Sequence, residues 1–364
     1  MNCLVITPHR YGIREVAERI GAEWEEMGHQ VDYELARGDA ARIGPITVGT
    51  PGIALWWYRR LRELAKGSDE YDLIWTHQPV APTLPTRDQA FWNRVIVTFH
   101  TTLCAEYELA RKGIYPRRLL LYHWITKKLE ERFYRRLQSL DEPGPHYTVI
   151  SPHLHDEVAQ FGIGPDETSI IPNGVFTPDQ REFNPIRDKY DIPADATLVF
   201  SIGSLTPQKR PASFAQLMNT ATDRTEDVYC VIAGKGPLQD AVEEHASDRL
   251  HVLGYVSDED KWRWFAEADI FATLSAYEGM PIAALEALSF GVPVLLSDIP
   301  SHRNLINQYD TTGALVSDDV DAIRSAIKRL RDESATVTLP NWHETAAAYL
   351  EVASSREKPH SVLY

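Results

Sequence analysis

Short apolar runs alternate with amphipathic stretches along most of the chain, and this alternation restricts the folds that the sequence can adopt. Residues 3–7 form a run of strand-forming residues, and residues 13–27 follow with a helical pattern that ends at Gly28. A strand, a helix and a further strand make a βαβ unit, and repeated units build a parallel sheet covered by helices. The pattern therefore predicts an α/β fold.

The remaining predicted strands are short and rich in apolar and β-branched residues. They cover residues 30–35, 72–76, 95–99 and 147–150 in the first half and residues 197–202, 228–233, 250–253, 270–273, 292–297 and 313–316 in the second. Predicted helices separate the later strands at residues 212–219, 238–244, 258–268, 282–290 and 320–332. Because the same pattern fills both halves, we expect two similar α/β domains.

A cluster of Pro, Asn and Gly at residues 172–178 interrupts the pattern, which resumes only after Pro185. We therefore expect one Rossmann-like domain at residues 1–172 and a second at residues 173–341. Their parallel sheets should face a cleft between the domains, because open α/β sheets bind ligands at such places. A last helical pattern follows Pro340, and we expect the C-terminal helix, about residues 342–364, to pack back on the first domain.

Composition and charge exclude several classes of protein. The net charge of −15 argues against a general affinity for nucleic acid. Three isolated cysteines suggest neither a metal site nor a disulfide framework and favour a reducing cytoplasm. The first residues lack the basic flank of a signal peptide, and no run of about 18 apolar residues is present. We therefore expect a cytoplasmic protein.

Two carboxylates stand eight positions apart in the segment from Tyr277 to Leu288. Glu278 precedes a Gly-Met-Pro turn, and Glu286 lies within a helix-forming run. Eight helical residues span about 12 Å, which is on the order of the distance from the sugar to the ribose in a nucleotide-sugar. The helix N-terminus between the two acids suits a pyrophosphate. The segment can therefore hold all three parts of an activated sugar.

Further motifs follow one another in a fixed order, most of them between residues 150 and 306. They are Ile171-Pro172-Asn173-Gly174-Val175, Ile202-Gly203-Ser204-Leu205-Thr206-Pro207-Gln208-Lys209-Arg210, Ile232-Ala233-Gly234-Lys235-Gly236-Pro237-Leu238, Leu253-Gly254-Tyr255-Val256, Ala268-Asp269-Ile270-Phe271-Ala272, the segment from Glu278 to Glu286, and Gly291-Val292-Pro293-Val294. With these motifs the chain resembles the retaining GT-B glycosyltransferases of the glycogen-synthase-like type, the glycosyl transferases of group 1. The resemblance implies two Rossmann-like domains, an N-terminal acceptor domain and a C-terminal nucleotide-sugar donor domain.

The resemblance also assigns roles within the Glu-rich segment. It implies that Glu278 binds the hydroxyls of the donor sugar and Glu286 those of the ribose, which suits carboxylates because they only accept hydrogen bonds. Backbone groups around Gly279, Met280 and Pro281 are expected to face the phosphates, although Pro281 has no N–H to donate. The structural alternative is a helix with an acid near its start and a solvated Glu two turns later.

The motif after the strand at residues 197–202 supplies the predicted cation. The resemblance places Lys209 on the donor diphosphate, where its ammonium stabilises the leaving group without a metal. Ser204 stands where the family commonly has an Arg, and a hydroxyl brings no charge. Arg210 lies next to Lys209 and can partly substitute for that Arg.

Other candidate residues lie at predicted strand ends. Lys235, between two glycines, can reach the nucleotide. His100 ends a strand where the family often has a His close to the donor sugar and the acceptor, and a structural histidine is the alternative. Gly12 lies in the first loop, where the family usually shows a glycine pair near the donor. Ser151 is either a ligand or a helix cap.

Several reaction classes lack their motifs in this sequence. No Gly-x-Gly-x-x-Gly follows the first strand, which argues against a dinucleotide dehydrogenase. No Asp-x-Asp directly follows a predicted strand and no His/Cys cluster is present, so we expect no metal and no other cofactor.

Residues 111–136 carry nine basic residues and only two acids, a net charge of +7, and aromatic and aliphatic residues lie among them. Such a helix can dock on anionic lipid, which would place the protein at the inner face of the membrane with a lipid-linked acceptor. An ordinary surface helix with its apolar side in the core is the alternative.

These observations predict a glycosyltransferase that moves a sugar from a nucleotide-sugar to a glycan or lipid-linked acceptor. The resemblance implies retention and metal independence, and front-side attack is expected because no residue is an evident nucleophile. Two alternatives remain: a weak or inactive binding pseudoenzyme, suggested by Ser204, and a sugar-nucleotide epimerase on the same fold.

Overall fold

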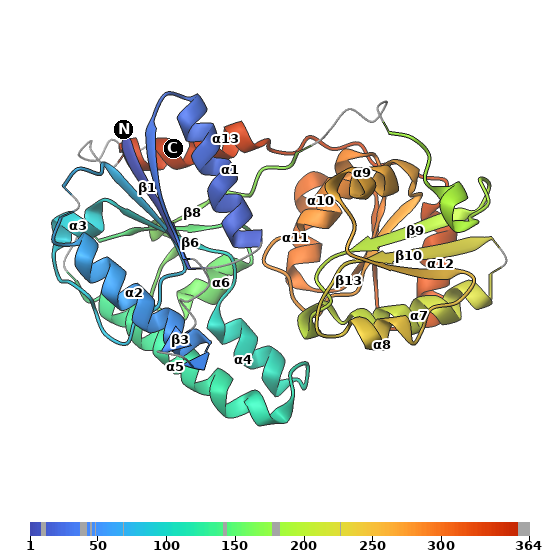
Figure 1. Ribbon diagram of the computed structural model, residues 1–364, viewed down its shortest axis with the longest axis horizontal. Helices are drawn as coiled ribbons and strands as arrows, with labels where there is room; N and C mark the ends of the chain where they lie inside the picture. Colours follow the sequence, from blue (N-terminus) through green and yellow to red (C-terminus); the bar gives the residue numbers. More distant parts are fainter. Residues whose placement is uncertain are drawn as a thin grey trace. The chain divides into compact units, whose positions relative to one another are not determined.

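The computed structural model describes residues 1–8, 12–36, 42–43, 46–47, 49–67, 69–140, 144–176, 183–225 and 227–355 (Figure 1). The chain divides into two compact units. The first consists of Met1–Gly174 and the segment that begins at Pro340, and the second of Val175–Leu339. The expected borders were residues 172 and 341. The end of the expected linker, residues 177–178, lies outside the described residues. So does the end of the C-terminal segment, residues 356–364.

The first unit contains a six-stranded parallel sheet in the order β2-β1-β5-β6-β7-β8. Its strands are β1 (Asn2–Thr7), β2 (Gln30–Leu35), β5 (Leu73–His77), β6 (Val95–Phe99), β7 (His146–Val149) and β8 (Thr168–Ile170). The short strands β3 (Arg42–Ile43) and β4 (Ile46–Thr47) form a separate antiparallel pair. The helices are α1 (Gly12–Glu26), α2 (Thr50–Leu64), α3 (Gln89–Asn93), α4 (Leu103–Arg111), α5 (Leu120–Leu137), α6 (Leu154–Ala159) and α13 (Trp342–Ser355).

Helix α13 completes the core of the first unit, although it follows the second unit in sequence. It packs along α1 (Figure 1). The indole nitrogen of Trp24 donates a hydrogen bond of 2.9 Å to the carbonyl of Ala346. The ring of Tyr349 lies 4.8 Å from that of Trp75 in the sheet. These buried aromatic contacts fasten the end of the described chain to the first sheet.

The second unit contains a six-stranded parallel sheet in the order β11-β10-β9-β12-β13-β14. Its strands are β9 (Thr197–Ile202), β10 (Val228–Ala233), β11 (Leu250–Gly254), β12 (Ile270–Thr273), β13 (Val294–Ser297) and β14 (Gly313–Val316). The helices are α7 (Pro211–Asp223), α8 (Gln239–Glu243), α9 (Asp258–Glu267), α10 (Ile282–Ser289), α11 (Pro300–Tyr309) and α12 (Val320–Leu330). The α/β fold with two similar sheets is thus confirmed.

Two hydrophobic clusters cover the two faces of the second sheet. Phe200 of β9 packs with Trp264 of α9 and Leu285 of α10 on one face. Val199, its neighbour in the strand, packs with Phe214 of α7 on the other. Successive strand residues point to opposite faces, so β9, β10, β12 and β13 contribute buried residues to both clusters. The sheet is therefore held rigidly between helices, and its carboxyl-end loops start from fixed points.

No helix within the described part of the chain combines the length and apolar character that a membrane crossing requires.

Candidate active site

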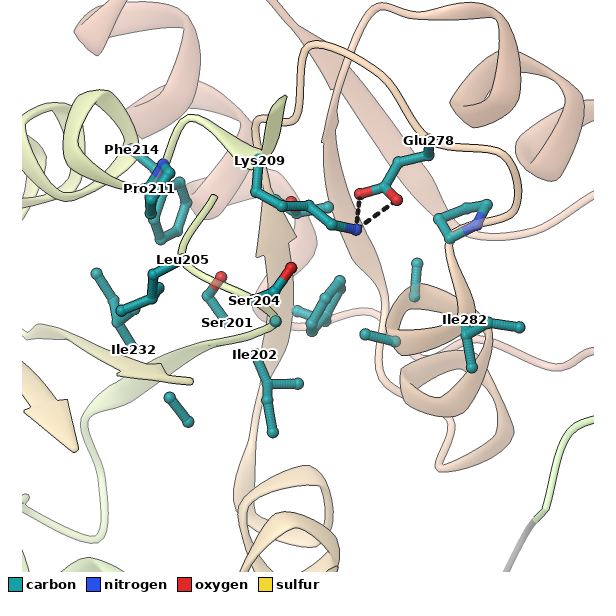
Figure 2. Close-up of a pocket in the computed structure, with 17 residues that line it drawn as sticks. Ser201, Ile202, Ser204, Leu205, Lys209, Pro211, Phe214, Ile232, Glu278 and Ile282 are labelled. Atoms are coloured by element: carbon teal, nitrogen blue, oxygen red, sulfur yellow. Dashed lines mark hydrogen bonds and ion pairs between the residues drawn. The ribbon is translucent and has the colours of Figure 1, made fainter. Parts of the chain in front are cut away.

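A pocket lies at the carboxyl ends of β9, β10 and β12 in the second unit (Figure 2). It is open to solvent, and its empty space, including the open mouth, is about 510 Å³. The residues that line it are Ser201, Ile202, Gly203, Ser204, Leu205, Lys209, Pro211, Phe214, Ile232, Ala233, Phe271, Thr273, Glu278, Pro281, Ile282, Ala283 and Ala284. Of the predicted site residues, it brings together Ser204, Lys209, Glu278 and Pro281.

The floor of the pocket depends on a close approach of two loops. The loop after β9 bonds to the loop after β10, where the N–H of Leu205 donates to the carbonyl of Lys235 at 2.9 Å. Gly234 adopts a φ of 138°, and a Cβ on it would lie 1.8 Å from the carbonyl oxygen of Gly203. A Cβ on Gly203 itself would meet no atom within 4 Å. The close approach of the two loops therefore requires glycine at position 234, whereas Gly203 faces open space.

Lys209 ends a short 3-10 turn, Pro207–Lys209, that follows β9. The carbonyl of Gln208 in this turn accepts a hydrogen bond of 2.8 Å from the N–H of Ala276, which ties the turn to the loop after β12. The ammonium of Lys209 forms an ion pair with both carboxylate oxygens of Glu278, as Figure 2 shows. The two residues that were expected to bind different parts of the donor are thus in direct contact.

Glu278 is only 7% exposed and is held by a chain of hydrogen bonds behind the pocket. The hydroxyl of Ser275 donates to its Oε1 at 2.7 Å, and the hydroxyl of Ser297 donates to the carbonyl of Ser275 at 2.6 Å. Nδ1 of the buried His302 lies 2.8 Å from the carbonyl oxygen of Ser297. Because a carbonyl only accepts, Nδ1 carries the proton. Burial lowers the pKa of His302, and the nearby charge of Glu278 opposes that effect.

Glu286 lies within a helix, as the sequence predicted, but it does not line the pocket. The helix is α10, and Oε1 of Glu286 is 2.9 Å from the ammonium of Lys261. That ammonium also lies 3.8 Å from the centroid of a Trp262 ring. The helix begins at Ile282, so residues 278–281 are not helical and the estimate of about 12 Å, which assumed eight helical residues, does not apply.

The helix N-terminus between the two acids is present, with Pro281 as its N-cap residue. The N–H of Ile282 bonds to the carbonyl of Met280 at 3.0 Å, and those of Ala284 and Leu285 bond to that of Pro281 at 3.0 and 3.1 Å. These three donors are therefore engaged within the chain in this structure. Gly279 and Met280 are not among the pocket-lining residues.

The remaining predicted donor residues of this unit lie at the edge of the pocket or outside it. Ser204 is exposed and lies 3.5 Å from the hydroxyl of Thr206. Arg210 forms a two-pronged ion pair with Asp318 and does not line the pocket, so the structure gives no support to its replacing a family Arg at Ser204. Lys235 is exposed, and its ammonium lies 5.4 Å from the centroid of the Tyr255 ring.

In the first unit, His100 follows β6 and pairs with a second histidine. Its Nε2 lies 2.9 Å from Nδ1 of His77, the last residue of β5, and the two rings stack with centroids 5.1 Å apart. The side chain of Gln78 accepts from the N–H of His100 at 3.0 Å and donates to the carbonyl of Thr101 at 2.6 Å. The strand predicted from the sequence ended at Thr76, so His77 was not identified as a candidate site residue.

Two further candidates in the first unit have simple surroundings. Gly12 is the first residue of α1, and a Cβ on it would meet no atom within 4 Å. Tyr11, its neighbour in the predicted loop, lies outside the described residues. Ser151 bonds to Nδ1 of His153 at 3.0 Å, and α6 begins after His153, so Ser151 is not the cap of that helix.

Among the side chains that the structure describes, no group of three or more His, Cys, Asp or Glu residues is arranged to hold a metal ion.

Comparisons with known families agree with this architecture. The model for Glycosyltransferase Family 4 matches residues 11–177, and the model for Glycosyl transferases group 1 matches residues 182–346. The two matches together cover most of both units. The chain belongs to the GT-B glycosyltransferases of group 1.

Individual relatives show how far the likeness extends. The chain is 31% identical over 202 residues, half of each protein, to the UDP-Gal:alpha-D-GlcNAc-diphosphoundecaprenol alpha-1,3-galactosyltransferase of Escherichia coli. It is 25% identical to the phosphatidyl-myo-inositol mannosyltransferase of Mycolicibacterium smegmatis over 79% of this chain and 66% of the relative. It therefore spans half to two thirds of the length of these relatives. A glycosyltransferase structure from Rickettsia africae has a TM-score of 0.67 at 14% identity, covers 99% of each chain, and supports the fold alone.

Proposed function

We propose that the chain transfers a sugar from a nucleotide-sugar donor to an acceptor, and that the pocket in the second unit holds the donor. The observation that carries the proposal is the pair of Lys209 and Glu278 in that pocket. A nucleotide-sugar presents a diphosphate and a set of vicinal hydroxyls. An ammonium and a carboxylate side by side match these two features.

In the proposed complex, the donor diphosphate takes the place of Glu278 at the ammonium of Lys209. Cleavage of the bond between the anomeric carbon and the phosphate oxygen leaves negative charge on the nucleoside diphosphate, and Lys209 stabilises that charge. Glu278 then accepts hydrogen bonds from the sugar hydroxyls. Ser275 keeps the carboxylate in place when the ion pair opens, because its hydroxyl remains bonded to Oε1.

The ribose hydroxyls are assigned to Glu286, whose Oε1 is engaged by Lys261. We also propose retention of configuration and transfer without a metal, as the family resemblance implies. The proposed route is attack from the same face as the departing diphosphate, with the leaving phosphate assisting deprotonation of the acceptor. His100 with His77 is the proposed group on the acceptor side.

The proposed acceptor is a glycan or a lipid-linked sugar. The names of the two relatives support this class, because one specifies a diphosphoundecaprenol-linked sugar and the other a phosphatidyl-myo-inositol. The donor base and sugar are left to experiment.

A thermal-shift screen of nucleotide-sugars tests the proposal first. Binding to the native state raises the melting temperature by mass action, so we expect one donor or one closely related group to raise it. That donor is then incubated with the protein and acceptor lipids, and release of nucleoside diphosphate is measured. If no nucleotide-sugar raises the melting temperature and none is consumed, the proposal is wrong.

One observation favours a second candidate function, a binding protein with weak or no catalysis. Ser204 brings no charge to the pocket. Arg210 pairs with Asp318 and is not among the residues that line the pocket. Tight donor binding in calorimetry with neither transfer nor hydrolysis would identify this function. Conversion of the donor without an acceptor would identify an epimerase.

A further inference from the structure

One face of the segment 117–135 combines exposed apolar and basic side chains in the first unit. Its residues recur every three or four positions, which places them on the same side of α5 and of the turn before it. All of them are exposed: Arg117, Arg118, Leu121, Trp124, Ile125, Lys128, Arg132 and Arg135. We refer to these eight residues as the α5 outer face.

The apolar part of the α5 outer face is large for a water-facing helix. Leu121 is 66% exposed, Trp124 46% and Ile125 49%, and the adjacent Leu120 is 37% exposed. The other large exposed apolar residues of the described chain are scattered singly over different elements. A contiguous exposed apolar patch generally marks a surface that contacts a partner or a membrane.

The opposite face of α5 already packs in the core of the first unit, so the helix has its place in the fold and only its outer face is left exposed. Phe133, Tyr134 and Leu137 are buried there. The hydroxyl of Tyr122 accepts a hydrogen bond of 2.9 Å from the N–H of Thr50, which anchors the first turns of α5 to α2. The surface-helix alternative from the sequence thus accounts for one side of α5 and leaves the outer face unexplained.

The charge of the α5 outer face identifies its partner. Five of the eight residues are basic and none is acidic; of the five, Lys128 also pairs with Glu131 of the same helix at 2.7 Å. The chain as a whole carries −15, and its largest basic excess, +7, falls within residues 111–136. Because the chain is negatively charged overall, an anionic surface repels most of it. It can approach such a surface only through a local positive face. The apolar residues between the flanking bases then suit a boundary between charged headgroups and acyl chains.

We propose that the α5 outer face docks the first unit on an anionic phospholipid bilayer. Leu121, Trp124 and Ile125 enter the boundary between the headgroups and the acyl chains. The basic residues on both sides pair with lipid phosphates, and α5 lies parallel to the membrane surface. This docking does not depend on donor turnover, and it would bring the protein to the surface where a lipid-linked acceptor resides.

Vesicle sedimentation tests the docking directly. The wild-type protein is mixed with vesicles of phosphatidylcholine alone or of phosphatidylcholine with phosphatidylglycerol. We expect sedimentation with the anionic vesicles only, and weaker binding as salt is raised. The double variant Leu121→Glu, Trp124→Glu should bind the anionic vesicles at least about tenfold more weakly than the wild type. The double variant Arg132→Glu, Arg135→Glu should lose binding to the same extent.

Ile170→Glu is the matched control, because Ile170 is a 44% exposed apolar residue of β8 in the same unit. It should bind vesicles like the wild type. All variants should keep the wild-type melting temperature and donor-induced shift, which separates docking from folding and from the proposed function. The proposal is overturned if the wild type ignores anionic vesicles or if the outer-face variants bind as well as the control. It is equally overturned if those variants only convert a wild-type dimer into a monomer.

Discussion

At the scale of single residues, the position of Glu278 is the most constrained feature of the candidate site. Lys209 contacts it from the pocket side, and Ser275 bonds to it from behind. Ser297 and His302 extend this support into the core, because each bonds to the backbone of the preceding serine in the chain of contacts. Ser275, Ser297 and His302 therefore act as positioning residues for the carboxylate.

Replacement of Ser275 tests this positioning role. Ser275→Ala removes one hydrogen bond to a charged group, which typically contributes about 1.5–3 kcal/mol, so kcat/KM should fall by roughly tenfold to a hundredfold. Kinetics with the identified donor, together with the melting temperature, measure the effect. Ser325→Ala is the control, because that hydroxyl bonds only to a carbonyl of α12. An unchanged kcat/KM in Ser275→Ala would show that Glu278 needs no such support.

The sequence assigned Lys209, Glu278 and Ser204 to one donor site because family motifs carry those residues after predicted strands. In the structure they line one pocket beyond the neighbouring strands β9 and β12. It did not reveal the contact between Lys209 and Glu278, since 69 positions separate them in the chain. His77 was missed because the predicted strand ended at Thr76 and its partner, His100, lies 23 positions away in the chain. His302 is only five positions from its partner Ser297, but no motif in the sequence marked it.

At the scale of elements, the close approach of the loops that follow β9 and β10 shapes the pocket. Gly234→Ala should destabilise the second unit by about 2 kcal/mol or more, since its Cβ would collide with the carbonyl of Gly203 and the positive φ disfavours a side chain. Gly203→Ala should leave the melting temperature unchanged but weaken donor binding, because its Cβ enters the pocket. Thermal unfolding and donor titration of both variants check these outcomes. Equal stability of the two variants would contradict the close approach.

A buried carboxyl links α4 to α5 in the first unit. Oε2 of Glu130 accepts a hydrogen bond of 3.1 Å from the N–H of Cys104, in the first turn of α4. The side chain is fully buried, and desolvation raises the pKa of Glu130 from 4.5 to about 8. The folded protein therefore keeps a proton on this group at pH values where the unfolded chain has released it.

The stability of the first unit should consequently depend on pH. A raised folded-state pKa lowers stability as pH rises from about 4.5 to about 8, because the unfolded state binds fewer protons in that window. Glu130→Gln removes this penalty, which reaches about 3 kcal/mol near neutral pH. Thermal unfolding at about pH 5 and about pH 8 should show that the variant gains stability over the wild type at the higher pH. Glu131→Gln is the control, and a gain independent of pH would contradict the assignment.

The strands were predictable because buried parallel strands read as continuous apolar runs. Strands β2, β6, β9, β10, β12 and β14 have the expected bounds. Several elements were missed: α2, α3, α4, α6 and α11, and the strands β3, β4 and β8. Strand β8 has three residues, too few for a pattern to be visible, and α3 and α6 are only slightly longer. Helix α11 is mostly polar, with three buried residues among ten, so its helical period is weak.

At the scale of the whole molecule, the candidate chemistry is divided between two units of the same architecture. Every residue that lines the pocket of the candidate site belongs to the second unit. The pair of His77 and His100 and the α5 outer face belong to the first. This division matches the donor and acceptor roles that the family resemblance implies. It also means that donor binding, membrane docking and transfer can be measured as separate properties of one chain.

Turnover of the identified donor by the wild type and two variants is the most direct test of the proposed function. Release of nucleoside diphosphate with acceptor lipids present should be lost in Lys209→Ala and in Glu286→Ala, while both keep the wild-type melting temperature. Lys189→Ala should behave like the wild type, because this lysine of the second unit lies by Tyr190 and outside the pocket. Near-wild-type turnover in Lys209→Ala would contradict the assignment of the donor to this pocket.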